Sequence, residues 1–170
     1  MSKLGLIAIL VTLIGATSCI RWCDNFKYQL DKMSTEMEIS WSLETIIDYL
    51  IAVKHPEEAE KAREYLQSLK SVRFDVTTSM EAKEKTKSFL KNCDEFSTQW
   101  KRSIEDEFLA ANKTTELAAV VEEIVKFFDI HGTPKAASYA RNDIELFKEG
   151  SYPLYEAKDR MRSRYFRILY

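Results

Sequence analysis

The strongest structural signal in the chain lies in residues 86–108, TKSFLKNCDEFSTQWKRSIEDEF. Side chains suited to a buried face recur there at intervals of three and four residues: Thr86, Phe89, Cys93, Phe96, Trp100, Ile104 and Phe108. This spacing places them on one side of an α-helix. We therefore expect a long helix over about 79–111, roughly 50 Å in length, that packs antiparallel to its neighbours in a helical bundle.

Apolar residues recur at helical spacing over most of the remaining chain as well. Residues 22–53 are expected to form either one long helix or two helices that meet near Ser40, where the phase of the apolar pattern shifts. Only residues 71–78 alternate as a strand would, and a single strand cannot form a sheet. We expect a connector there, followed by a helix that begins at Thr78 or Ser79.

The composition supports a helical fold, because 170 residues contain only 4 glycines and 3 prolines. An all-β protein with many turns would need more of both residues, and Gly-rich phosphate loops would need more glycine. The breakers outside the N-terminal segment are expected to mark helix boundaries: Gly132 and Gly150 at ends, Pro56, Pro134 and Pro153 at beginnings. The sequence thus predicts one all-α domain of five to six helices over residues 19–170.

The first eighteen residues resemble a secretory signal peptide. Lys3 precedes an apolar run over 4–14, and small residues follow at 15–18. We expect cleavage after Ser18, with cleavage after Cys19 as an alternative. An uncleaved anchor is a further alternative, although the run is short for a membrane span of roughly 20 residues. Residues 16–19 also loosely resemble the bacterial lipoprotein cleavage box, in which Cys19 would carry the lipid.

The later chain contains no stretch of transmembrane length, so the mature protein is expected to be secreted without a transmembrane segment. Its formal net charge is only −2 before cleavage, which is too small to indicate a nucleic-acid partner.

Three cysteines leave one over after any single pairing: Cys19, Cys23 and Cys93. If Cys19 is removed or lipidated, Cys23 and Cys93 are expected to form a disulfide in an oxidising compartment. The alternatives are a bond between Cys19 and Cys23, or an unpaired Cys93 on the buried face of its helix. No CxxC or HxxxH spacing is present, which argues against structural zinc.

The sequon Asn112-Lys113-Thr114 falls where the long helix should end and the next helix should begin. An N-linked glycan must lie on an exposed loop, so we predict glycosylation of Asn112. The alternative is an unmodified surface turn.

No residue pattern indicates catalysis. His55 and His131 each stand beside an expected helix terminus, where a capping or solvent-facing role is the simplest interpretation. No nucleophile signature accompanies them, and no Glu-x-x-His motif supports a di-metal bundle site. The carboxylates alternate with basic residues, as on a solvated helix surface. The sequence predicts a protein that is not an enzyme and needs no cofactor or metal.

The end of the chain is basic, and Arg160, Arg164 and Arg167 share one face of the expected last helix. Such a face could bind an acidic partner or an anionic membrane. The alternative is a terminal helix that packs on the core and exposes its arginines to solvent.

These features together predict a secreted, non-enzymatic binding or interaction protein. Three Trp, nine Phe and eight Tyr recur at helical spacing, where they either fill the core or line a cavity for a hydrophobic ligand. The alternative function is an effector or partner-binding module that acts through its surface and its basic C-terminal helix. The partner is either another protein or an apolar small molecule, and the sequence identifies neither.

Overall fold

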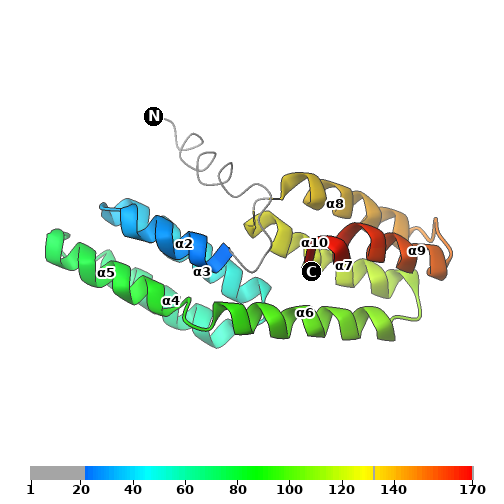
Figure 1. Ribbon diagram of the computed structural model, residues 1–170, viewed down its shortest axis with the longest axis horizontal. Coiled ribbons are helices and arrows are strands. Elements are labelled where there is room, and N and C mark those ends of the chain that lie inside the picture. The colour runs from blue at the N-terminus through cyan, green and yellow to red at the C-terminus, as the bar shows by residue number, and fades with distance from the viewer. Residues whose placement is uncertain (1–21, 132, 170) are drawn as a thin grey trace. The chain divides into compact units, whose positions relative to one another are not determined.

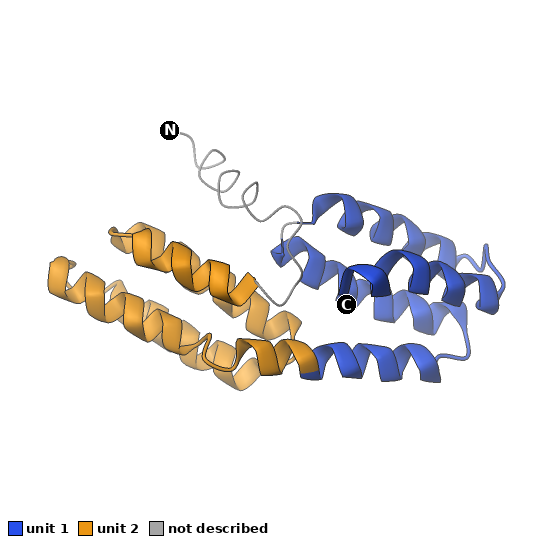
Figure 2. Cartoon of the chain, viewed as in Figure 1, with its two compact units in different colours: residues 1–20, 99–170 blue, residues 21–98 orange. Residues whose placement is uncertain are grey.

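The computed structural model describes residues 22–131 and 133–169. Every regular element in these residues is helical, which confirms the all-α prediction (Figure 1). The predicted signal peptide and Cys19 lie outside the described residues. The described residues divide into two compact units, with residues 22–98 in unit 2 and residues 99–131 and 133–169 in unit 1 (Figure 2). The single domain over 19–170 stays a prediction.

Unit 2 is a group of helices joined by short connections. Helix α3 packs against α4 and α5, and α2 packs against α5. The elements are α2 (Trp22–Lys32), α3 (Glu36–Ala52), α4 (Pro56–Leu69), α5 (Val76–Ser88) and the first turns of α6 (Cys93–Ala110).

Residues 22–53 form two helices, and the break lies at Met33–Thr35 rather than near Ser40. Thr35 is the N-cap of α3, and its hydroxyl oxygen accepts from the Glu38 backbone N–H at 3.2 Å. The Glu38 carboxylate in turn accepts from the Thr35 backbone N–H at 3.1 Å. This capping box satisfies two backbone donors at the helix start. The break was expected near Ser40 because the phase of the apolar pattern shifts there. The Thr-x-x-Glu pattern that begins at Thr35 instead determines where α3 starts.

The residues before α5 form a connector, as expected, but the helix begins at Val76, two or three residues before the predicted start at Thr78 or Ser79. Its N-cap is Asp75, whose carboxylate accepts from the Thr78 backbone N–H at 2.9 Å. Thr78 therefore lies within the first turn instead of capping it. An aspartate is among the strongest N-cap residues, which explains why the helix begins at Val76.

Helices α5 and α6 together confirm the predicted long helix, which runs over 35 residues from Val76 to Ala110. The backbone tightens at Phe89–Asn92, where hydrogen bonds join residues three apart, such as Leu90 N–H to the Lys87 carbonyl at 2.9 Å. Such short 3₁₀-like stretches are common at helix ends. The apolar stripe survives this interruption, because Cys93, Trp100 and Phe108 are all at most 2% exposed.

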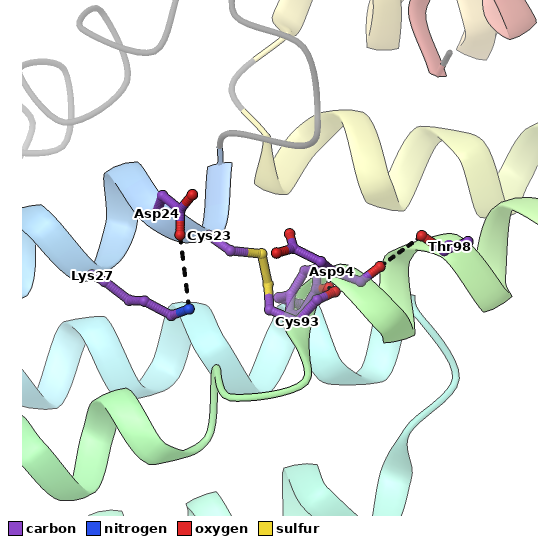
Figure 3. Close-up of a disulfide and its surroundings, with 7 residues drawn as sticks. Cys23, Asp24, Lys27, Cys93, Asp94 and Thr98 are labelled. Atoms are coloured by element: carbon purple, nitrogen blue, oxygen red, sulfur yellow. Dashed lines mark hydrogen bonds and ion pairs between the residues drawn. A yellow bond between two sulfur atoms is a disulfide. The ribbon is translucent and has the colours of Figure 1, made fainter.

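A disulfide joins Cys23 in the first turn of α2 to Cys93 at the start of α6, with a Cα–Cα distance of 6.2 Å (Figure 3). This confirms the predicted pairing. Both cysteines are buried, and the Tyr49 hydroxyl donates to the Cys93 carbonyl at 2.7 Å. Trp22 stacks on the same tyrosine ring, with centroids 4.8 Å apart. The bond is therefore embedded in an aromatic cluster that belongs to the core of unit 2.

Unit 1 contains the remainder of α6 and the C-terminal helices. Helix α7 packs against α8 and α9, and η2 packs against α8. The elements are α7 (Thr114–Ile130), α8 (Pro134–Lys148), α9 (Leu154–Met161), the π-helical turn η2 (Arg162–Phe166) and α10 (Arg167–Leu169). With α5–α6 and α9–η2–α10 each counted as one helix, residues 22–131 and 133–169 contain seven helices against the five to six expected, since residues 22–53 form two.

The predicted helix boundaries at proline and glycine agree with the structure where it describes them. Pro56 and Pro134 lie at the first positions of α4 and α8, and Pro153 precedes α9 as its N-cap. Gly150 follows the end of α8 with a φ of 69°, a left-handed conformation that glycine adopts at little cost. Gly132 lies outside the described residues.

Among the helices of residues 22–131 and 133–169, none has the length and apolar content needed to cross a membrane.

Candidate functional site

Helix α8 carries a carboxylate on its buried face. Asp143 follows Ala140 by three residues and precedes Phe147 by four, so all three side chains lie on the same side of the helix. The Asp143 side chain is fully buried, with 0% exposure. A carboxylate in this position needs compensating charges and hydrogen bonds, because burial of an unpaired charge is costly.

The end of the chain supplies those partners. Arg160 donates from Nε to Asp143 Oδ1 at 2.8 Å, and Arg164 donates from Nη1 to Asp143 Oδ2 at 3.4 Å. The Tyr165 hydroxyl also donates to Oδ2. Burial and this hydrogen bond to a carboxylate raise the pKa of Tyr165 above its usual value. The phenol therefore remains a donor at neutral pH.

Three arginines of α9 and η2 lie over aromatic rings. The Arg160 guanidinium is 5.0 Å from the Tyr152 ring centroid, and that of Arg164 is 5.9 Å from Tyr139. The Arg162 guanidinium is 5.2 Å from the ring of Phe108 in α6. These distances are typical of cation–π contacts, which restrict the orientation of a planar guanidinium.

The same three arginines line a surface groove of about 600 Å³ that is open to solvent. Tyr155 lies in this groove and is 71% exposed, a high value for a large aromatic side chain. We call this surface the tyrosine–arginine groove, and its lining residues are Tyr152, Tyr155, Glu156, Asp159, Arg160, Arg162, Ser163 and Arg164. It combines basic, acidic and aromatic groups on one short segment of chain.

The structure divides the predicted arginine face. Arg160 and Arg164 lie together at Asp143 and in the groove, whereas Arg167 is exposed and does not line it. The cause is the π-helical turn η2, which changes the phase of the residues after Met161. Sequence reasoning did not identify Arg162 as a residue of the groove. It also did not identify Asp143 as the residue that binds Arg160 and Arg164. An acid at a stripe position of α8 was the available signal for Asp143.

The predicted sequon lies on a loop. Asn112 is exposed between α6 and α7, its backbone N–H donates to the Glu116 carboxylate at 2.7 Å, and its side-chain amide donates to the Ala110 carbonyl at 2.9 Å. Glycosylation of Asn112 stays a prediction.

The two histidines differ from each other in environment. His55 precedes Pro56, is half-buried and stacks on Phe96 with centroids 3.6 Å apart. His131 caps the end of α7, is 6% exposed and bonds through Nδ1 to the Phe127 carbonyl at 2.9 Å. Burial lowers the pKa of His131 to about 4. Of the two roles expected for His131, capping agrees with the structure, whereas the ring does not face solvent but packs on Phe127 within the core of unit 1.

A second groove, of about 510 Å³, lies on α4, on α5 and on Phe89, which follows α5. It is open to solvent and is lined largely by charged or polar side chains: Glu58, Lys61, Glu64, Tyr65, Ser68, Lys85, Ser88 and Phe89. Sites for apolar ligands are concave and mostly apolar, so neither groove has the lining that a hydrophobic ligand requires. In the part of the chain that the structure describes, no three histidine, cysteine or carboxylate side chains are grouped to hold a metal ion.

No protein-family model, curated protein or solved structure matches this chain.

Proposed function

We propose that this chain is a secreted, non-enzymatic protein that binds a partner through the tyrosine–arginine groove of α9 and η2. The observation that carries the proposal is the placement of Arg160, Arg162 and Arg164 over three different aromatic rings beside one groove. The proposal adds a specific surface to the binding role that the sequence predicts.

The energetic argument is preorganisation. Arginine normally loses considerable side-chain freedom on binding, at a cost of about 0.5–1.5 kcal/mol for each immobilised side chain. Arg160 and Arg164 are already held by Asp143, and all three arginines are oriented by rings. Tyrosine and arginine are also the residue types enriched among interface hot spots. A partner can therefore use these groups at a reduced entropic cost.

The non-enzymatic part of the proposal rests on the composition of the groove. Its lining includes neither His55 nor His131, and the acids Glu156 and Asp159 stand among arginines rather than beside an activated nucleophile. This arrangement suits recognition of a surface.

Secretion and glycosylation complete the proposal. The signal-like residues 1–18 and the disulfide between Cys23 and Cys93 are both compatible with an oxidising, extracellular compartment. Expression of the full chain in eukaryotic cells should release a shortened protein into the medium. Intact mass before and after removal of N-glycans, with Asn112→Gln as the control, tests the cleavage and the glycan together.

The binding function is tested by selection of random-sequence displayed peptides on the secreted protein. We expect selected peptides to lose binding to the Arg162→Ala and Tyr155→Ala variants. Matched controls remove the same residue types elsewhere: Arg63→Ala, which loses only an exposed pair with Glu60, and Tyr28→Ala on α2. If no selected peptide distinguishes the groove variants from these controls, the groove is not the binding surface.

A further inference from the structure

We infer that the groove receives an acidic segment of a partner protein, whose carboxylates pair with Arg160, Arg162 and Arg164. This inference rests on the proposed function and specifies the chemistry of the partner. It comes from three properties of the groove: the hydrogen-bond donors that its arginines leave unused, the charge of the surrounding segment and the acids that lie among the arginines.

The arginines keep most of their donors available. A guanidinium has five N–H donors, and Arg160 uses Nε alone for Asp143 while Arg164 uses Nη1. Arg162 has its ring contact with Phe108 and no hydrogen bond or ion pair to any residue of 22–131 or 133–169. Both Nη groups of Arg160 and the whole fork of Arg162 can therefore bind a carboxylate in the bidentate manner that arginine favours.

The charge of this segment differs from that of its own unit. Residues 154–169 contain five basic and two acidic side chains, a net charge of +3, whereas residues 99–153 contain seven basic and ten acidic side chains, a net charge of −3. The groove lining itself carries three arginines against Glu156 and Asp159, a net charge of +1, and Lys158 and Arg167 add positive charge to the same segment outside the groove. Such a positively charged segment attracts and orients an acidic partner.

The acids within the groove favour a protein segment over a membrane or nucleic acid. Glu156 and Asp159 lie among the arginines, and each would repel a continuous array of phosphates. A polypeptide can place a basic side chain opposite Asp159 and carboxylates opposite the arginines. The exposed ring of Tyr155 offers an apolar contact that a peptide side chain can cover.

The test uses the protein that cells expressing the full chain release into the medium, with the displayed-peptide selection described above. Peptides whose binding depends on Arg162 should be enriched in Asp and Glu relative to the starting library. For the strongest of them, synthetic copies with Gln and Asn in place of Glu and Asp should bind about tenfold more weakly, which corresponds to a loss of about 1.4 kcal/mol. Added salt should weaken the acidic peptide more than its amide copy.

Variants of Arg162 separate charge from geometry. Arg162→Ala should abolish most of the preference for acidic peptides, whereas Arg162→Lys should retain part of it because lysine keeps the charge but loses the planar fork. Far-ultraviolet circular dichroism checks that each variant remains folded, and Arg63→Ala again serves as the control.

Several results would overturn the inference without affecting the proposed function. Neutral or basic groove-dependent peptides would do so, and so would equal binding of acidic peptides and their amide copies. Arg162-dependent binding to phosphatidylserine vesicles that exceeds binding to acidic peptides would indicate a membrane surface instead. If no peptide depends on Arg162 or Tyr155, the proposed function itself fails, and the inference fails with it.

Discussion

Arg160 binds the fully buried carboxylate of Asp143 through Nε at 2.8 Å, and this bond ties α9 to the inner face of α8. The arginine is itself only partly buried, with 23% of its side chain exposed. One end of the pair therefore belongs to the core and the other end to the surface. The same carboxylate binds Arg160 and Arg164, two of the residues that line the groove.

Replacing Asp143 with Asn should destabilise the protein by about 3 kcal/mol, because the substitution removes the charge that compensates the arginines and leaves the Tyr165 hydroxyl with a weaker acceptor. Urea unfolding followed by circular dichroism measures the change. Arg164→Ala is the matched comparison: its bond to Asp143 is longer and its side chain is 38% exposed, so its cost should be about 1 kcal/mol or less. Equal costs for the two variants would contradict this account.

The stability of the protein should fall in acid through His131. Its pKa is lowered from the ordinary value of 6.5 to about 4 by burial, with the nearby charge of Lys101 acting in the same direction. The folded state therefore takes up a proton less readily than the unfolded state. The contribution of His131 to the free energy of unfolding is complete above pH 6.5. It is lost as the pH falls from 6.5 to about 4, which lowers the free energy of unfolding by about 3 kcal/mol in total.

The contribution of His131 is isolated by His131→Phe, which keeps an aromatic ring against Phe127 but cannot take up a proton. Free energies of unfolding measured at several pH values between 7 and 4 should show a smaller decline for the variant. Parallel curves for the two proteins would show that another group causes the acid sensitivity.

Loss of the Cys23–Cys93 disulfide should lower the free energy of unfolding by about 4 kcal/mol, since the bond closes a loop with a sequence separation of 70 residues. Urea unfolding with and without reductant measures this difference, and mass spectrometry confirms the state of the bond. Tyr49→Phe provides a local comparison, because it removes only the hydrogen bond to the Cys93 carbonyl and should cost about 1 kcal/mol. Equal stability of the oxidised and reduced proteins would refute the prediction.

The capping box of α3 predicts that Thr35→Ala costs about 1 kcal/mol, whereas Thr35→Ser, which keeps the hydroxyl, costs little. The hydrogen bonds from the Ser34 and Thr35 backbone also lower the pKa of Glu38. Its stabilising contribution is therefore present at neutral pH and is lost as the pH falls through that lowered pKa. Thermal unfolding of the two variants at pH 7 and in acid tests both statements.

The sequence was sufficient for the fold class, because buried stripes at helical spacing and a few breakers determine where helices form. Cys23 and Cys93 were paired on the expectation that Cys19 is removed or lipidated, which would leave them no other partner. The position of the break at Thr35 was also readable, since Thr-x-x-Glu is a local pattern, but the phase shift near Ser40 was given more weight. The helices and the break at Thr35 depend on residues close together in sequence, whereas the disulfide could be predicted because the chain has so few cysteines.

The groove could be predicted only in part. Basic residues at the C-terminus were visible, yet their roles depend on Asp143, seventeen residues before Arg160. The contact between Arg162 and Phe108 joins residues 54 positions apart. The direction in which residues after Met161 point also depends on a π-helical turn, and no local residue pattern predicts such a turn. Long-range pairing and an irregular turn are the physical reasons that Arg162 was missed and Arg167 was misplaced.

The π-helical turn η2 has a consequence for length variation in this protein. Ala157, Met161, Tyr165 and Leu169 are all buried at intervals of four residues, whereas residues four apart in a regular α-helix rotate by about 40° per step. The wide turn absorbs that rotation and keeps all four on the core. Deletion of a single residue between Arg162 and Phe166 would restore regular winding and leave Leu169 eleven positions after Ala157, a rotation of only about 20° that keeps Leu169 on the core. The segment can therefore lose one residue at η2 and still keep its buried face.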